Sequence, residues 1–150
     1  MMRRNIILRN KSFLSILSKS ENVGLARIAV ATFSSNLDFT LSEIEEIKVA
    51  ISEAVTNCII HGYPENEGKI DISMQIDEDI LIVEIVDYGI GISDVNAVLQ
   101  PSYSTKENHM GLGLAFIDSF MDDFKLNSSI DQSTIIIMKL LSDKKDLESL

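Results

Sequence analysis

The sequence has a single cysteine, Cys58, and only two prolines, Pro64 and Pro101. One cysteine excludes an internal disulfide and a zinc site built from cysteines, and it favours a reducing, cytoplasmic location. With so few prolines, no repeats and no low-complexity tract, no stretch reads as a linker between domains. The 150 residues therefore predict one domain, which is long enough to bury a core without a disulfide or metal.

Basic residues are also scarce. The chain has 13 Lys and Arg against 23 Asp and Glu, a net charge of −10, which excludes a general basic surface for nucleic acid. Residues 1–11 hold four basic residues and no acid, which leaves −14 on the remainder of the −10 chain. We expect a basic N-terminal extension over 1–11, one domain over 12–142 and a solvated tail over 143–150.

Long apolar runs are missing as well. Runs such as Ile80–Val83 and Ile135–Met138 are far too short to cross a bilayer, so no membrane partner is expected. Arg9, Asn10 and Lys11 interrupt the apolar part of the N-terminus, and no small-residue cleavage site follows. We interpret this segment as an extension, with a signal peptide as the alternative.

Hydrophobic spacing predicts an alternation of strands and helices. Ser42 and Glu45 fit a capping box for the second of the expected helices. Because helices should cover one face of a mixed, mostly antiparallel sheet, the fold class is α+β. The expected elements are a strand at 13–17, helices at 20–37 and 43–60, strands at 69–76 and 80–86, a loop at 87–110, a helix at 111–123, and strands at 124–129 and 134–141.

Glu53 and Asn57 lie four residues apart in the second expected helix, so both project from one face, off its apolar stripe. A carboxylate can accept a proton, and an amide oxygen can hold a hard cation such as Mg²⁺. The pair predicts a site at which a proton acceptor and a metal ligand lie side by side. The alternative is a solvated polar face. Cys58, the next residue, lies on the apolar stripe and is expected in the core.

Asp87 directly follows a buried strand and begins the pattern Asp-x-Gly-x-Gly, which ends at Gly91. Such a segment can place a carboxylate beside a cleft while the backbone approaches a ligand closely. The alternative is a simple glycine turn. The pattern is not a dinucleotide-binding fingerprint, because the third glycine and the following helix are missing.

Gly111-Leu-Gly113 is expected to open a helix, where free backbone N–H groups and the helix dipole favour a phosphate. Ser104, Thr105 and Lys106 lie just upstream and offer hydroxyls and a cation. The alternative is an ordinary helix start after a flexible loop. The phosphate-binding motif G-x-x-x-x-G-K-[ST] is absent from the sequence, so this is not a P-loop protein.

Taken in this order, the three motifs resemble the N, G1 and G2 boxes of the GHKL ATPase superfamily. The segment SEAVTNCIIHGY (52–63) narrows the resemblance to the small anti-sigma-factor serine kinases, as do LARIAVATF (25–33), STK (104–106) and FMDDFKLNSS (120–129). The resemblance extends over about residues 12–142. The sporulation branch, the anti-sigma F factors, is favoured, and the general-stress (sigma B) branch is the alternative.

The resemblance implies a Bergerat fold that binds ATP or ADP with Mg²⁺ under a lid. It implies that Glu53 is the general base for a substrate serine and that Asn57 is the Mg²⁺ ligand. It also implies a role in nucleotide binding for a larger group of residues. These are Asp87 at the adenine amino group with Gly89 and Gly91 beside it, Thr105 and Lys106 in the lid, Gly111 and Gly113 at the phosphates, and Thr134 near the adenine.

The implied function is that of an anti-sigma factor and an ATP-dependent serine kinase. Such a protein binds an RNA polymerase sigma factor and phosphorylates an anti-anti-sigma factor, and the family implies a homodimer. Arg27 matches an arginine that contacts both protein partners; the alternative is a solvated helix residue. Residues 107–110 (ENHM) lack the arginine that the family places before Gly-x-Gly. The alternative function is therefore a nucleotide-gated binding module with weak or no kinase activity.

Overall fold

The computed structural model describes residues 8–91, 108–129 and 131–141. Over these residues the elements follow the expected order of strand, two helices, hairpin, helix and hairpin. The elements are β1 (Leu8–Leu17), the 3₁₀ turn η1 (Ser20–Asn22), α1 (Val23–Ser34), α2 (Leu41–Asn57), the π-helical turn η2 (Cys58–Gly62), β2 (Lys69–Asp77), β3 (Ile80–Asp87), α4 (Asn108–Phe120), β4 (Asp123–Ser129) and β5 (Gln132–Leu140).

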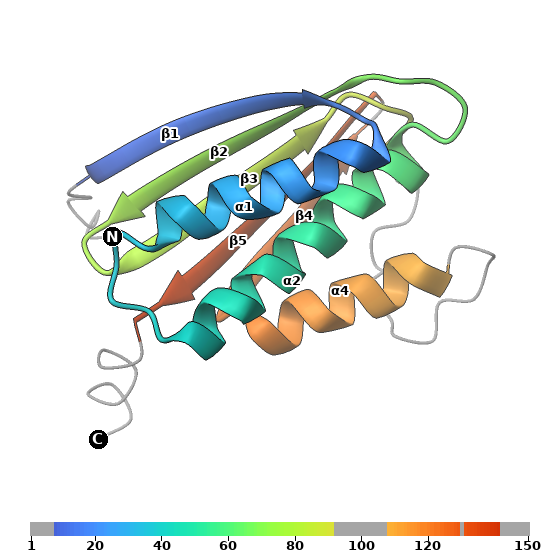
Figure 1. The fold of residues 1–150 in the computed structure, drawn as a ribbon. Coiled ribbons are helices and arrows are strands. Elements are labelled where there is room, and N and C mark those ends of the chain that lie inside the picture. The colour runs from blue at the N-terminus through green and yellow to red at the C-terminus, as the bar shows by residue number, and fades with distance from the viewer. Residues whose placement is uncertain (1–7, 92–107, 130, 142–150) are drawn as a thin grey trace, which may run out of the picture.

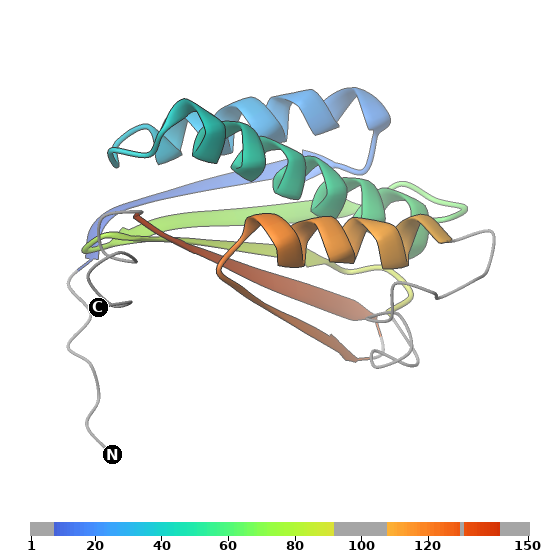
Figure 2. The same cartoon turned by 90° about the horizontal axis from the view of Figure 1, so that it is seen from below.

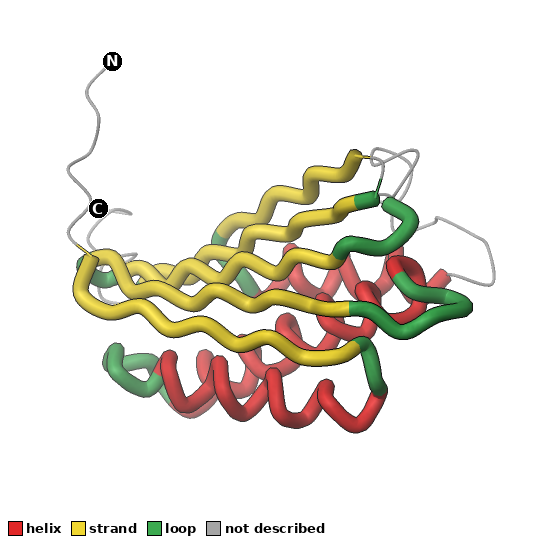
Figure 3. The backbone as a smooth tube through the Cα atoms, turned by 90° about the horizontal axis from the view of Figure 1, so that it is seen from above, coloured by secondary structure: helices red, strands yellow, loops and turns green. Residues whose placement is uncertain are grey.

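The five described strands form one sheet in the order β1-β2-β3-β5-β4. All four pairings between neighbours are antiparallel, so the expected mixed sheet is corrected to an antiparallel one. The helices lie on one face of this sheet (Figure 2, Figure 3), and α2 lies between α1 and α4 (Figure 1). The α+β class and its single helical layer are confirmed.

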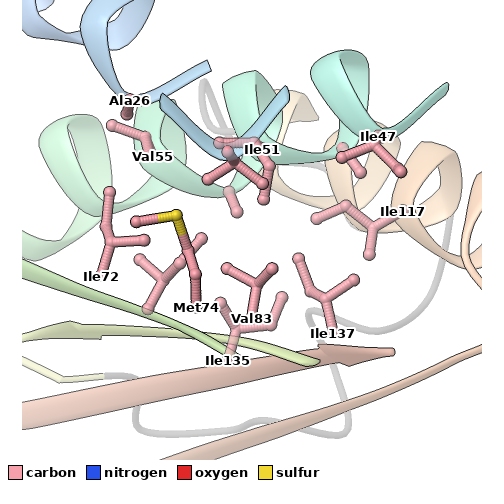
Figure 4. Close-up of a cluster of buried hydrophobic side chains, with 14 of the residues drawn as sticks. Ala26, Ile47, Ile51, Val55, Ile72, Met74, Val83, Ile117, Ile135 and Ile137 are labelled. Carbon is pink, nitrogen blue, oxygen red and sulfur yellow. The ribbon is translucent and has the colours of Figure 1, made fainter. Parts of the chain in front are cut away.

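The core fills the space between the sheet and the helices (Figure 4). Alternate residues of β2 face the helices and are buried, as the period of two in its sequence predicts. Burial alternates along β5 in the same way, although its sequence holds a continuous apolar run. The stripe expected on α1 is buried too, at Ala26, Val30 and Phe33. Because α2 is covered by α1, α4 and the sheet, it holds the most enclosed position of the three helices and can present residues to both neighbours.

Strand β1 begins five residues before the expected Phe13. Leu8 pairs with Asp77 and Lys11 with Gln75, so the last part of the expected extension belongs to the sheet. Most side chains of β1 are exposed, and main-chain pairing rather than burial holds this edge strand. Hydrophobic alternation could not have located its start.

The capping box of α2 is formed two residues before the expected one. The Thr40 hydroxyl accepts from the Glu43 N–H at 3.1 Å, and the Glu43 carboxylate accepts from the Thr40 N–H at 3.0 Å. The prediction of Ser42 and Glu45 was therefore wrong in register. The sequence TLSEIEE fits the capping-box pattern twice, and the earlier site gives the longer helix.

Helix α2 does not end in a regular turn. Beyond Asn57 the backbone widens into a π-helical turn, in which the Tyr63 N–H donates to the Cys58 carbonyl at 3.2 Å. Such turns often occur at functional sites. No helix within the described residues is both long and apolar enough to cross a membrane.

Candidate functional site

A cavity that is partly open to solvent lies where the end of α2, the end of β3, α4 and the β4–β5 hairpin meet. Together with the solvent space at its mouth it holds about 440 Å³. Its lining includes four residues that the sequence motifs single out: Asn57, Asp87, Gly91 and Thr134. These positions come from two motifs and from the closing strand, and the fold brings them to one cavity. Apolar walls with a few polar groups are typical of small-molecule sites.

Asp87 is the last residue of β3, and its side chain is only 4% exposed. Burial raises the pKa of this carboxyl, while hydrogen bonds from the Gly89 N–H and from the Cys58 thiol act in the opposite direction. The Gly89 N–H lies 3.1 Å from Asp87 Oδ1. A buried carboxylate on a cavity wall is a strong acceptor for a ligand N–H, because water competes poorly for it.

The thiol of Cys58 lies against this carboxylate. Burial, followed by the charge of Asp87, raises the pKa of Cys58 well above its ordinary value. Cys58 is buried, as expected, but it also lines the cavity. It therefore acts as a neutral thiol in the wall behind Asp87 rather than as a reactive group.

The chain segments around Asp87 approach one another too closely for side chains. A Cβ on Gly62 would lie 2.8 Å from Asp87 Oδ1, and one on Gly89 would overlap the Gly62 carbonyl. Gly91 has a φ of 76°, and a side chain there would overlap the carbonyl oxygen of Ser129. The glycines of this motif are thus explained by close backbone approach and, at Gly91, by a left-handed conformation.

Glu53 and Asn57 face α4. A Cβ on the buried Gly113 would lie 2.9 Å from Glu53 Oε2 and 3.3 Å from Asn57 Nδ2. Gly113 therefore lets α4 approach the two polar side chains of α2. The carboxylate and the amide are brought to the same place, as their spacing predicts, and Asn57 also lines the cavity.

Helix α4 begins at Asn108, three residues before Gly111. Gly111 and Gly113 therefore lie within the helix and do not open it, which corrects the expected helix start. An N–H in the second turn belongs to the i→i−4 ladder of a regular α-helix. A phosphate contact through the Gly113 N–H stays a prediction, and the observed function of this glycine is close packing.

Arg27 is absent from the cavity lining. Arg27, on α1, is half-buried, and its Nη1 lies 3.4 Å from the Ser52 hydroxyl on α2. Its role as a partner contact stays a prediction. Thr105 and Lys106 lie outside the described residues.

The sequence motifs missed several residues of the site. Gly62, Cys58 and Ser133 line the cavity, yet none was expected there. Gly62 lies in the segment 52–63 but was assigned no role, and Cys58 was expected only in the core. The position of Cys58 and Gly62 could have indicated their role. Both follow Asn57 within the π-helical turn that faces Asp87.

A metal ion at this site would have to be coordinated by the protein and a bound ligand together. Within the described part of the chain, no group of three or more His, Cys, Asp or Glu residues could hold a metal alone. Mg²⁺ is commonly bound by one or two protein oxygens together with substrate phosphates and water. Asn57, beside the space that Gly113 leaves free of a side chain, fits that kind of site.

The chain belongs to the histidine kinase-like ATPase domain family, which matches residues 16–140. Within this family its relatives are anti-sigma F factors. The chain is 44% identical to the anti-sigma F factor of Clostridium acetobutylicum over 135 residues, which is 89% of this chain and 94% of the relative. It is 41% identical to that of Bacillus subtilis over 144 residues, 93% of this chain and 99% of the relative. These matches confirm the resemblance found in the motifs.

Solved structures confirm the fold. The RsbU and RsbW domains of a Mycobacterium tuberculosis protein superpose with a TM-score of 0.65 and 17% identity, over 88% of this chain and 32% of that one. The histidine kinase domain of a blue-light activated kinase from Erythrobacter litoralis superposes with a TM-score of 0.56 and 15% identity, over 87% of this chain and 64% of that one. Nucleotide binding is assigned from the match to the ATPase domain family over residues 16–140.

Proposed function

We propose that the protein is an ATP-dependent anti-sigma factor of the sigma F type and a serine kinase for its anti-anti-sigma antagonist. The observation that carries the proposal is that Asn57, Asp87, Gly91 and Thr134 line the same cavity, with Glu53 beside Asn57. The names of the relatives, anti-sigma F factors at 41–44% identity, support the choice of partner.

ATP would lie along the end of α2. The adenine amino group would donate to Asp87, near Thr134, and the phosphates would extend toward Asn57 and Gly113. Thr105 and Lys106, outside the described residues, would close over the phosphates, with Gly111 near them. Mg²⁺, held by Asn57 and the phosphates, would supply charge neutralisation. The body of the chain is acidic, so local groups rather than net charge must attract the nucleotide.

In the proposed reaction the hydroxyl oxygen of a substrate serine attacks the γ-phosphorus. The bond from that phosphorus to the β,γ-bridging oxygen breaks, and ADP leaves with the electron pair. Glu53 accepts the proton of the serine hydroxyl. Since phosphoryl transfer depends mostly on positioning and charge stabilisation, the rigid placement of Glu53 on α2 suits the role. The substrate must bring its own surface, because the described domain has no second lobe.

Sigma-factor binding would block transcription while the antagonist is phosphorylated, and the unphosphorylated antagonist would release the sigma factor. Arg27 on α1 would contact both protein partners. The protein would act in the cytoplasm as a homodimer, without a membrane or direct nucleic-acid partner. The excess of acidic residues offers a surface for a basic sigma factor.

Glu53→Gln tests the catalytic role. The variant keeps the shape of the side chain but removes the base, so we expect phosphoserine formation on the antagonist to fall by about 10²–10⁴-fold. Transfer from labelled ATP measures it, and ATP affinity is measured in parallel. Glu45→Gln, an exposed change on the same helix, is the matched control. Unchanged transfer by folded Glu53→Gln protein would exclude Glu53 as the base.

A second candidate is a nucleotide-gated anti-sigma module with weak or no kinase activity. The observation that favours it is the segment 107–110, which has no arginine to face the γ-phosphate. Neither Lys106 nor His109 supplies a permanent planar fork. This candidate predicts sigma-factor binding that ATP strengthens, with no phosphoserine after long incubation of the wild-type protein.

A further inference from the structure

The segment after β3 is held by the residues that end the second helix. The Ile90 N–H donates to the Gly62 carbonyl at 3.0 Å, and the Tyr88 N–H donates to the Tyr63 hydroxyl oxygen at 2.7 Å. The Gly89 N–H, between them, donates to Asp87. Three consecutive backbone N–H groups therefore have fixed partners, and two of these partners are adjacent residues.

The hydroxyl of Tyr63 joins two segments at once. It donates to the Lys69 carbonyl at 2.7 Å while it accepts from the Tyr88 N–H at 2.7 Å. The regular pairing of β2 with β3 ends at Ile70 and Asp87. Immediately beyond that pair, the hydroxyl stands between a carbonyl of β2 and an N–H of the chain leaving β3. It continues the connection between the strands where their own ladder stops.

The position of the Tyr63 ring is itself fixed. The ring lies directly over Gly68, where a Cβ would overlap it, and it packs against the core. Burial raises the pKa of the Tyr63 hydroxyl, so the group keeps its hydrogen at neutral pH and remains a donor to Lys69. A hydroxyl held in this way fixes the direction in which the chain leaves Asp87.

We propose that Tyr63 is a positioning residue for recognition of the nucleotide base. It holds the backbone at Tyr88, next to the carboxylate of Asp87 and three residues before Gly91, and both of these line the cavity. The inference rests on the proposed function, since it concerns the same nucleotide site. Small displacements of a supporting residue are enough to loosen a binding site.

Tyr63→Phe tests the inference, because it removes the bridging hydroxyl and keeps the ring. We expect the dissociation constant for ATP to rise about threefold to tenfold, the effect of one or two hydrogen bonds. The dissociation constant for GTP, which lacks the amino group that Asp87 accepts from, should change less than twofold. The ATP-to-GTP preference therefore falls, and hydrogen exchange of the Tyr88 amide accelerates.

Tyr88→Phe is the matched control. The Tyr88 hydroxyl donates to Asp71 at 2.8 Å, and removing it leaves the Tyr88 N–H bonded to Tyr63. We expect this variant to keep the wild-type affinities for both nucleotides. Melting curves of both variants show whether each is folded.

The outcomes separate the two proposals. If folded Tyr63→Phe binds ATP as tightly as wild type, or loses ATP and GTP affinity equally, Tyr63 has no role in base recognition and the proposed function stands. If Tyr88→Phe reproduces the loss, the effect belongs to the hydroxyl network of Asp71 and the inference is wrong. If the wild-type protein binds no ATP, the proposed function fails and this inference fails with it.

Discussion

Burial of Asp87 lowers the stability of the folded protein at neutral pH and makes its carboxylate a stronger acceptor for a ligand. The side chain is almost fully buried, and burial raises its pKa. A folded-state pKa above the unfolded value means that folding disfavours the ionised form. The contribution of Asp87 to stability is therefore fully present below the ordinary pKa of 3.8 and is lost as the pH rises through the folded-state value. At neutral pH the ionised carboxylate destabilises the protein without nucleotide.

Asp87→Asn tests the effect of this carboxylate on both nucleotide binding and stability. Asparagine keeps an oxygen for the Gly89 N–H but cannot ionise, and it cannot replace a charged acceptor for an adenine amino group. We expect ATP affinity to fall about tenfold or more, while the melting temperature of the nucleotide-free protein rises at pH 7. Calorimetry with ATP and melting curves over a pH series measure the two effects.

The pH series is the sharper part of this experiment. The gain in melting temperature should shrink as the pH is lowered toward the ordinary pKa of 3.8, because the carboxyl of Asp87 takes up a proton. Asp131→Asn provides the control, because that residue lies in the exposed turn between β4 and β5. A gain that does not change with pH would show that ionisation of Asp87 is not its cause.

At the scale of the element, the start of α2 depends on one reciprocal pair. Thr40 and Glu43 satisfy each other's backbone N–H groups. Thr40→Ala should lower the free energy of unfolding by about 0.5–2 kcal/mol. Ser42→Ala, at the position that the sequence pattern also fits, should have no comparable effect. Urea denaturation measures both, and an equal loss in the two variants would contradict the observed cap.

The sequence predicted the elements that have a buried face. Strand β2 was predicted from its alternation, β3 and β5 from their apolar runs, and α1 from the spacing of its apolar stripe. The predicted extents of the three strands agree with the structure to within a few residues. The start of α4 was missed because glycine has a low helix propensity. Leu114 and Ile117 are buried, and this packing carries the helix through Gly111 and Gly113.

The candidate site was predictable where a motif bears a charged or amide side chain. Asn57 and Asp87 were found in this way, and they do meet at one cavity. Cys58, Gly62 and Tyr63 were not, because their contribution comes from contacts across the fold rather than from local spacing. No pattern within the helix indicates that a tyrosine hydroxyl will meet the chain leaving a distant strand.

At the scale of the whole molecule, a buried cation of the sheet bonds to two helices of the helical layer. Lys139 of β5 is 2% exposed, and its Nζ donates to the Phe120 carbonyl at the end of α4 and, at 3.1 Å, to Glu46 on α2. A sheet residue thus contacts the end of α4 and a side chain of α2. The carbonyl at the end of a helix lacks an intrahelical partner, and a cation there is favourable.

Lys139→Ala should therefore lower the free energy of unfolding by about 2–4 kcal/mol, through the lost hydrogen bonds and the space left behind. Lys139→Met keeps most of the volume and should lose less. Glu46→Gln, at a partly exposed partner, is the control and should cost less than about 1 kcal/mol. Denaturation curves decide, and a loss below 0.5 kcal/mol for the alanine variant would contradict the role, since that is the scale of an ordinary surface change.

The π-helical turn at Cys58–Gly62 makes the chain around it intolerant of changes in length. Glu53 and Asn57 face α4 before the turn, while Gly62 at its end and Tyr63 just after it meet the chain beyond β3. Losing or gaining one residue between 53 and 63 would rotate one set against the other by about 100°, one residue of a 3.6-residue turn. The exposed segment 64–67 carries no such constraint. Insertions among homologous chains should therefore collect after Tyr63 and be excluded from residues 53–63.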